Sequence, residues 1–355
     1  MSHPCKSGKV ASRPVLFALA TLLWLAASSV FARALEVRSI VLSVSDLDRS
    51  VAFYESALGF SKVSERLIDD RSRDDATGIS GARVRSATLR LGDESIELEQ
   101  YLSPAGRAIP PDSRANDLWF QHFAVVVGDM DRAHAHLSRF AVQAISSAPQ
   151  TIPASNTAAA GIRAFKFRDP DGHPLELLQF PPGKGNPKWQ AHSGRLFLGI
   201  DHTAITVADT ERSLVFYRDL LGLRVSGASL NSGPTQEQLD DAPGALVRVT
   251  GLRPDENAGP GLEFLQYLMP AGGRPAPADL RPGDLAHARV VLQVDDLERI
   301  ADQLARRLSF DIVGLGAGER GLLVTDPDGH AVMLVERAAA SRVSNLEQGA
   351  SERMP

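Results

Sequence analysis

Residues 44–60, VSDLDRSVAFYESALGF, recur in altered form at residues 207–223, VADTERSLVFYRDLLGL. Both stretches open with an Asp that can cap a helix, carry apolar residues at helical spacing and end at a Gly. Such self-similarity indicates that one structural unit has been duplicated. It is a stronger guide to architecture than local propensity.

Two further pairs of matching segments follow these stretches at similar spacing. IELEQYLSPAGR (96–107) matches LEFLQYLMPAGGR (262–274), and DPDGHPLEL (169–177) matches DPDGHAVML (326–334). The chain therefore contains two related halves. The halves differ at a few polar positions, and those differences point toward function.

Each half contains two repeats of a smaller pattern: a strand, a helix and three further strands. Asp46 is a good N-cap for the first helix, and Gly59 ends it. The pair Gly92-Asp93 between two alternating segments indicates a hairpin. The elements expected in the first half are strands at 39–45, 60–66, 84–91, 95–102, 120–127, 164–169 and 174–180, helices at 47–58 and 129–140, and a charged loop at 69–75.

The N-terminal residues 1–34 have the pattern of a secretory signal peptide. Basic residues precede an apolar run at 15–32, and Ala32-Arg33-Ala34 offers small residues where a signal peptidase cuts. An uncleaved membrane anchor is the alternative, because the run is near the lower length limit of a spanning helix. Cys5, the only cysteine, would leave with the signal. We expect an exported protein, periplasmic or secreted, without stable membrane association after cleavage.

Composition excludes one class of partner. The chain is 43% hydrophobic and 23% charged, which is ordinary for a globular protein. Its net charge is −5 and its basic residues are scattered, so it lacks the electrostatic footprint of a nucleic-acid-binding protein.

The fold class is α+β, with four βαβββ modules after the signal peptide. The chain resembles the vicinal oxygen chelate superfamily, which includes glyoxalase I, extradiol dioxygenases, methylmalonyl-CoA epimerases and bleomycin-resistance proteins. D-x-x-R-S-x-x-F-Y-x-x-x-L-G and D-P-D-G-H, each present twice, carry the resemblance over nearly the whole mature chain. It implies that paired modules form two half-barrel sheets, each around one site.

The expected domain boundaries follow from the repeats and from a stretch rich in Pro and Gly. Because four modules can pair within one chain, we expect a monomer. The predicted order is a signal peptide (1–34), a first vicinal oxygen chelate domain with modules one and two (35–182), a linker (183–198), a second such domain with modules three and four (199–337) and a disordered tail (338–355).

The resemblance also implies candidate metal ligands. In such proteins a module can contribute a His seven residues before the Asp that opens its helix, and a Glu on its last strand. Only modules two and three keep both, because Ser is a poor ligand and Arg does not deprotonate. The residues at these positions are Ser39 and Glu97, His122 and Glu176, His202 and Glu263, and Arg289 and Met333, in modules one to four.

Module pairing decides which of these residues meet. Pairing within each half gives two incomplete sites, one of them with Glu97, His122 and Glu176. Pairing module two with three, and one with four, resembles single-chain four-module glyoxalases. We expect this crossed pairing, because it yields one complete metal site: His122, Glu176, His202 and Glu263.

The chemistry of such a site follows from its ligands. Two imidazoles and two carboxylates suit Ni, Zn, Co, Mn or Fe(II), and donor type does not separate these metals. Open coordination positions let a small-molecule substrate chelate through vicinal oxygens, so that the metal polarises a carbonyl and stabilises an enediolate. Glu176 and Glu263 are the candidate catalytic residues that carry the proton.

The favoured function is therefore an exported, metal-dependent, glyoxalase-like lyase or isomerase. Two alternatives stay open. An extradiol-type ring-cleaving dioxygenase needs two His and one Glu with Fe(II), usually within the second half, where Arg289 and Met333 replace ligands. A non-catalytic protein of the same fold binds a small molecule without metal, since a fold alone does not establish catalysis.

Overall fold

The computed structural model describes residues 33–68, 81–140, 142–191, 194–254, 259–305, 312–316 and 319–337. These residues belong to the unit Phe31–Pro355. The charged loop at 69–75, the tail at 338–355 and residues 1–32 of the predicted signal lie outside them. The domain boundaries, the cleavage site and the monomeric state stay predictions.

The first module has the expected order of elements. Asp46 accepts a hydrogen bond from the Arg49 backbone N–H at 3.0 Å and so caps the helix. Gly59 ends it with φ 73°, where a residue without Cβ is favoured. The elements are β1 (Ala34–Ser43), α1 (Leu47–Leu58), β2 (Ser61–Ile68), β3 (Arg83–Leu91) and β4 (Glu94–Ser103).

The other three modules repeat this order with additions. None of the helices in the described ranges is long and apolar enough to cross a membrane. Module two has β5 (Phe120–Val127), α3 (Met130–Leu137), β6 (Gln143–Ala144), β7 (Gln150–Thr151), β8 (Arg163–Arg168) and β9 (Pro174–Gln179). A 3₁₀ helix (Pro187–Gln190) precedes module three, which has β10 (Phe197–Thr206), α4 (Thr210–Leu214) with a π-helical turn (Val215–Leu220), β11 (Arg224–Ser232), α5 (Pro234–Asp240), β12 (Leu246–Arg253) and β13 (Gly261–Met269). Module four has β14 (Ala288–Val294), α6 (Leu297–Ala305), β15 (Val313–Gly316), β16 (Glu319–Thr325) and β17 (Ala331–Glu336).

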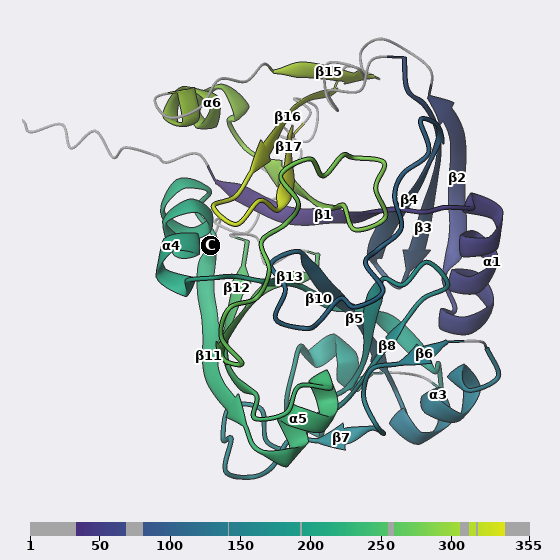
Figure 1. Cartoon of the computed structure of the whole chain (residues 1–355), viewed down its shortest axis with the longest axis vertical. Helices are drawn as coiled ribbons and strands as arrows, with labels where there is room; N and C mark the ends of the chain where they lie inside the picture. The colour runs from purple at the N-terminus through teal and green to yellow at the C-terminus, as the bar shows by residue number, and fades with distance from the viewer. Residues whose placement is uncertain are drawn as a thin grey trace, which may run out of the picture. The chain divides into compact units, whose positions relative to one another are not determined.

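The described strands form two sheets, and each sheet joins one module from each half. The eight-stranded sheet has the order β15-β16-β17-β14-β1-β4-β3-β2, which combines modules four and one. The nine-stranded sheet has the order β11-β12-β13-β10-β5-β9-β8-β6, with β7 paired to β8 off this path, and it combines modules three and two. Figure 1 shows the result for the first sheet, where the purple strand β1 lies beside the yellow-green strands from the chain's end. The expected crossed pairing is confirmed.

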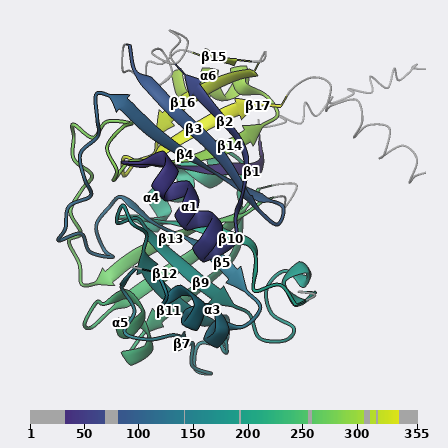
Figure 2. The same cartoon turned by 90° about the vertical axis from the view of Figure 1, so that its right-hand side faces the viewer.

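Each sheet buries one face under helices. Alternation along the strands sends every second side chain to that face. Phe123 and Leu177 of module two join Tyr54 of α1 in one core cluster, so this core lies between modules one and two. Phe264 and Leu292 belong to a second cluster, which joins modules three and four. The two modules of each half thus pack around one core, whereas each sheet combines strands from both halves (Figure 2).

The D-P-D-G-H turns fasten neighbouring modules within each half. Asp171 accepts hydrogen bonds from the Ser45 hydroxyl at 2.6 Å and its backbone N–H at 3.0 Å, and it pairs with Arg49. Asp169 accepts from the buried Tyr54 hydroxyl at 2.9 Å. The second half repeats the contacts with Asp328 on Arg212 and Asp326 on Tyr217. In each half, the repeated helix motif and the D-P-D-G-H turn therefore contact each other.

The P-A-G-R segments fasten the crossed pairs. Arg107 donates to the buried carboxylate of Asp284 through its backbone N–H, Nε and Nη2, at 2.6–3.0 Å. Arg274 makes the same three contacts with Asp117, at 2.7–3.1 Å. One contact joins module one to the segment before module four, and the other joins module three to the segment before module two. Each is a bidentate, charge-assisted pair, which is a strong and directional interaction.

This packing makes Gly273 sensitive to any side chain. A Cβ at Gly273 would lie 1.6 Å from the Asn116 carbonyl oxygen, next to the Arg274–Asp117 contact. We expect Gly273→Ala to lower the free energy of unfolding by about 2–3 kcal/mol, because backbone must shift to relieve the overlap. Urea denaturation followed by circular dichroism measures this.

Gly227→Ala is the matched control, since a Cβ there meets nothing within 4 Å. Its free energy of unfolding should stay within about 0.5 kcal/mol of the parent. Equal effects of the two substitutions would contradict the close approach at Gly273.

Candidate metal centre

Four strands of the nine-stranded sheet present polar side chains to the face opposite the helices. On β5, β9 and β13 the core-facing Phe123, Leu177 and Phe264 alternate with other residues. Alternation therefore turns His122, Glu176 and Glu263 to the inner face. His202 reaches it from β10, which pairs with β5 in the register Ala204↔His122 and His202↔Ala124.

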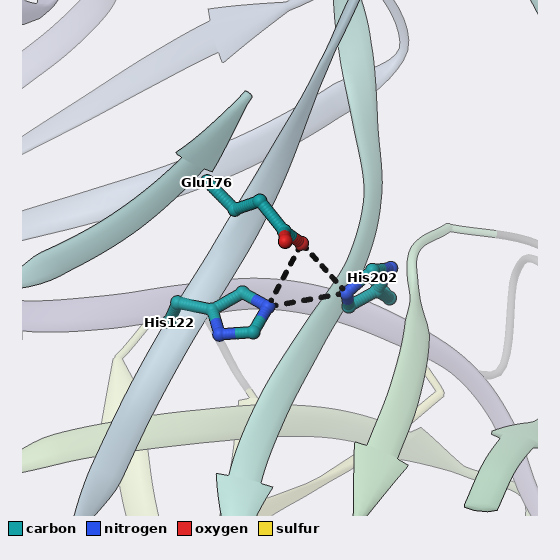
Figure 3. Close-up of side chains that lie close together, drawn as sticks. All are labelled: His122, Glu176 and His202. Carbon is teal, nitrogen blue, oxygen red and sulfur yellow. Dashed lines mark hydrogen bonds and ion pairs between the residues drawn. The ribbon is translucent and has the colours of Figure 1, made fainter. Parts of the chain in front are cut away.

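The structure brings the four predicted ligands together. His122 Nε2 and His202 Nε2 are 3.3 Å apart, and Glu176 Oε2 lies 3.1 Å from the first and 3.7 Å from the second (Figure 3). Glu263 Oε2 lies 3.4 Å from His202 Nε2. Residues from two halves of the chain thus converge on one point.

Three of these four separations, 3.1–3.4 Å, fit a shared divalent ion, and the fourth, 3.7 Å between Glu176 and His202, is slightly longer. Ligand atoms about 2.1 Å from one ion, at angles of about 90–110°, lie about 3.0–3.4 Å apart. His122, Glu176 and His202 offer atoms within 4.8 Å of one another and can hold a metal ion. Imidazole and carboxylate donors suit several first-row divalent metals, and the identity of the metal stays open.

The two glutamates differ in their surroundings. The Glu176 side chain is 7% exposed, and although burial opposes its charge, the nearby His122 and Lys166 lower its pKa to about 2. The Glu263 side chain is 29% exposed, and burial raises its pKa despite the adjacent His202. Glu176 is thus held firmly as an anion, whereas Glu263 takes up a proton more readily.

The two histidines are electrically unequal without a metal. Burial, and then the charge of Lys166, lower the pKa of His122 to about 4. Burial also opposes the charge on His202, but the carboxylates of Glu263 and Asp201 raise its pKa to about 9. Without a metal, the surrounding carboxylates therefore favour the protonated form of His202 at neutral pH.

Asp201 orients His202 from behind. Its Oδ2 lies 3.1 Å from His202 Nδ1, so the ring presents Nε2 to the centre. Its Oδ1 accepts from Trp189 Nε1 at 2.9 Å and from Arg253 Nη2 at 3.3 Å. The buried Trp189 belongs to the segment predicted as a linker. Burial opposes the charge on Asp201, but its hydrogen bond with His202 lowers its pKa to about 2.

A buried lysine lies on the same inner face. Lys166 on β8 pairs across the ladder with Glu176, and its Nζ lies 2.7 Å from Asp240 Oδ1 at the end of α5. Asp240 Oδ2 accepts from the Tyr267 hydroxyl at 2.7 Å and from Gln236 Nε2 at 2.6 Å. Burial opposes the charge on Lys166, but Asp240 and Glu176 raise its pKa.

The other sheet uses the equivalent positions differently. Ser39 donates to Glu97 at 2.9 Å, and Arg289 forms a buried ion pair with Glu99 at 2.6 Å. Met333 packs in an apolar cluster with Val41 and other residues. Modules one and four therefore have no His/Glu pair at these positions, as the register indicated.

The two histidines of the D-P-D-G-H turns, His173 and His330, are held by hydrogen bonds within the fold. His173 Nδ1 lies 2.9 Å from Asp169 Oδ2, and its Nε2 lies 2.9 Å from the Leu285 carbonyl oxygen. His330 Nδ1 lies 2.8 Å from Asp326 Oδ2.

Sequence reasoning missed the residues that surround the four ligands. Asp201 directly precedes His202, and Lys166 is the single charge among apolar residues in AFKF; both were readable signals. Asp240 and Tyr267 carried no comparable signal, because only folding brings α5 against β13.

Comparison with known proteins agrees with this geometry. The model of the Glyoxalase/Bleomycin resistance protein/Dioxygenase superfamily matches residues 37–177 and 199–334. The chain therefore belongs to this superfamily, whose members typically use divalent metals.

Individual relatives match most of the chain in fold, or 40% of it in sequence. Glyoxalase I from Zea mays superposes with a TM-score of 0.56 at 18% identity, over 88% of this chain and 95% of that one. A dioxygenase-like protein from Bacillus subtilis superposes with a TM-score of 0.53 at 14% identity, over 86% of each chain. The uncharacterized protein YwkD of Bacillus subtilis is 28% identical over 143 residues, covering 40% of this chain and 95% of that protein.

Metal binding should depend on pH through His202. A divalent ion needs the lone pair of a neutral imidazole, and this pKa is about 9 without metal. Affinity should therefore rise roughly tenfold per pH unit over about pH 6–8 and level off above the pKa. Competition between the protein and a chelator for Zn²⁺ at several pH values measures this, and a flat profile would contradict the proton on His202.

Asp201 should control metal affinity without touching the metal. Asp201→Asn keeps the shape but weakens the contact that holds the His202 ring and its tautomer, so Zn²⁺ affinity should fall about 10–100-fold. The melting temperature of the metal-free variant separates this effect from general destabilisation. Unchanged affinity in a folded variant would remove Asp201 from the centre.

Proposed function

We propose that the protein is a metal-dependent, glyoxalase-like lyase or isomerase, acting by proton transfer next to a chelated carbonyl. The observation that supports this most is the convergence of His122, Glu176, His202 and Glu263 at 3.1–3.7 Å from across the β5/β10 pairing. Similarity in fold to glyoxalase I from Zea mays also favours it.

The proposal assigns different roles to the ligand residues. His122, His202 and Glu176 hold the ion, because all three are buried and tightly grouped. When bound, a divalent ion supplies a Lewis acid for a substrate with vicinal oxygens and lowers the pKa of the C–H beside its carbonyl.

Glu263 is the better candidate for the residue that moves the proton. Its side chain is more exposed than that of Glu176, 29% against 7%, so it has more room to turn toward a substrate. Its raised pKa brings it closer to the working pH of a general base, whereas Glu176 remains an anion beside two imidazoles.

A ring-cleaving dioxygenase is the second candidate. The tightest cluster, His122, Glu176 and His202, has the two-His, one-carboxylate composition of Fe(II) oxygenases. The fold similarity to the dioxygenase-like protein from Bacillus subtilis accords with it. Glu263 favours the first proposal, because it adds a fourth donor, a second carboxylate oxygen, 3.4 Å from His202 Nε2.

We also propose that the protein is exported. The support is the basic start, the apolar run and the Ala-x-Ala site at the N-terminus. N-terminal sequencing of protein recovered from outside the cytoplasm tests the cleavage site.

Proton exchange into a panel of small hydroxyketones in D₂O, followed by NMR, tests the activity. We expect exchange with Zn²⁺- or Ni²⁺-loaded protein, and its loss with chelated protein. Glu263→Gln should keep the metal and slow exchange about 10²–10⁴-fold, because the proton carrier is removed.

His122→Ala and His202→Ala are the companion variants, and each should release the metal. Oxygen uptake with a catechol by Fe(II)-loaded protein, without proton exchange, would support the dioxygenase instead. Binding of no metal would leave a non-catalytic small-molecule binding protein.

A further inference from the structure

Helix α5 covers the inner face beside the metal centre. It belongs to an insertion between β11 and β12, and Figure 1 shows it next to β7 and β11. Leu239 packs against Ala124, Ala164 and Leu178. The following Ala242 and Ala245 pack with Ala204. Because Ala124 and Ala204 lie directly across the β5/β10 ladder from the two ligand histidines, α5 and the segment after it lie over the inner face next to the centre.

Three donors converge on one carboxylate under this helix. Lys166 Nζ, the Tyr267 hydroxyl and Gln236 Nε2 lie 2.6–2.7 Å from the two oxygens of Asp240. The Lys166 and Asp240 side chains are 4% and 0% exposed. This arrangement is a built carboxylate site, and a residue of the covering segment fills it.

Two features adjoin this carboxylate site. Asp240 lines a cavity of about 500 Å³, together with Arg114, Asn116 and Ala242. Gln236 Oε1 is buried and has no hydrogen-bond partner within the described residues, so the covering helix leaves one acceptor unsatisfied.

Charge selects the ligand. If α5 moves away, Lys166 loses Asp240 and stays buried without its nearest counter-charge, which is costly. A neutral ligand leaves that cost in place, whereas a carboxylate takes over the contacts with Lys166 and the Tyr267 hydroxyl. Lys166 stands opposite Glu176 on the ladder, so the carboxylate would lie next to oxygens chelated at the centre.

We propose that Lys166 and Tyr267 form a carboxylate subsite that Asp240 occupies in the closed state, so that the substrate is a small carboxylate with an adjacent hydroxyl or carbonyl group. This builds on the proposed function, since it names the substrate class of the same site. The subsite itself requires no metal, which allows it to be tested separately.

Glycolate and its neutral amide, glycolamide, are the matched probes. Their binding to chelator-treated protein is measured by calorimetry for the parent, Asp240→Asn and Glu237→Gln. Asp240→Asn removes the internal competitor and should tighten glycolate binding tenfold or more, leaving glycolamide unchanged. Glu237→Gln makes the same charge change three residues earlier on α5 and should behave like the parent.

Two further variants keep the test informative if single charges are needed for folding. Lys166→Met combined with Asp240→Asn removes both buried charges together and should abolish glycolate binding. Tyr267→Phe keeps the packing and should weaken glycolate binding several-fold.

Hydrogen exchange provides a second readout on the parent protein. Glycolate should speed amide exchange in α5, because the helix is displaced, and glycolamide should not. Glycolate affinity equal in Asp240→Asn and Glu237→Gln, or retained in the double variant, would overturn the subsite. The proposed lyase or isomerase activity would still be tested separately by proton exchange on neutral hydroxyketones, because that assay uses metal-loaded protein and no carboxylates.

Discussion

The antiparallel pairing of β5 with β10 is the contact on which the candidate metal centre depends. It sets His122 and His202 from different halves of the chain 3.3 Å apart and brings each one's neighbouring strand, β9 or β13, with its glutamate. The Arg274–Asp117 contact fastens this pairing from outside the sheet. A shift of the register by one residue would turn one histidine to the opposite face.

Charge balance explains the rest of the inner face. The centre gathers two glutamates, Asp201 and Asp240 in a buried region, which is unfavourable unless cations compensate them. Lys166 and the proton on His202 supply part of that compensation, and a divalent ion is a natural replacement for the proton. In the other sheet, the Arg289–Glu99 pair meets the same need without ligands.

Fold and centre together narrow the function more than either does alone. The superfamily fold is shared by lyases, isomerases, oxygenases and binding proteins, so the fold does not choose between them. The fourth donor, Glu263, and the carboxylate held by Lys166 under α5 are features of this chain. Glu263 supports the proposal of proton transfer, and the carboxylate held by Lys166 supports the proposal of a negatively charged substrate.

The sequence by itself determined the modules and their helix caps, because these follow from local periodicity and from a repeat that can be aligned with itself. The resemblance to the superfamily then implied four candidate ligand positions. It also favoured the crossed pairing, since only that pairing completed a His/Glu/His/Glu set. Only the tertiary structure decided that Glu263 is more exposed than Glu176, that Asp201 orients His202 and that Asp240 meets Lys166. Those facts depend on burial and on contacts between residues far apart in the chain, which no local pattern encodes.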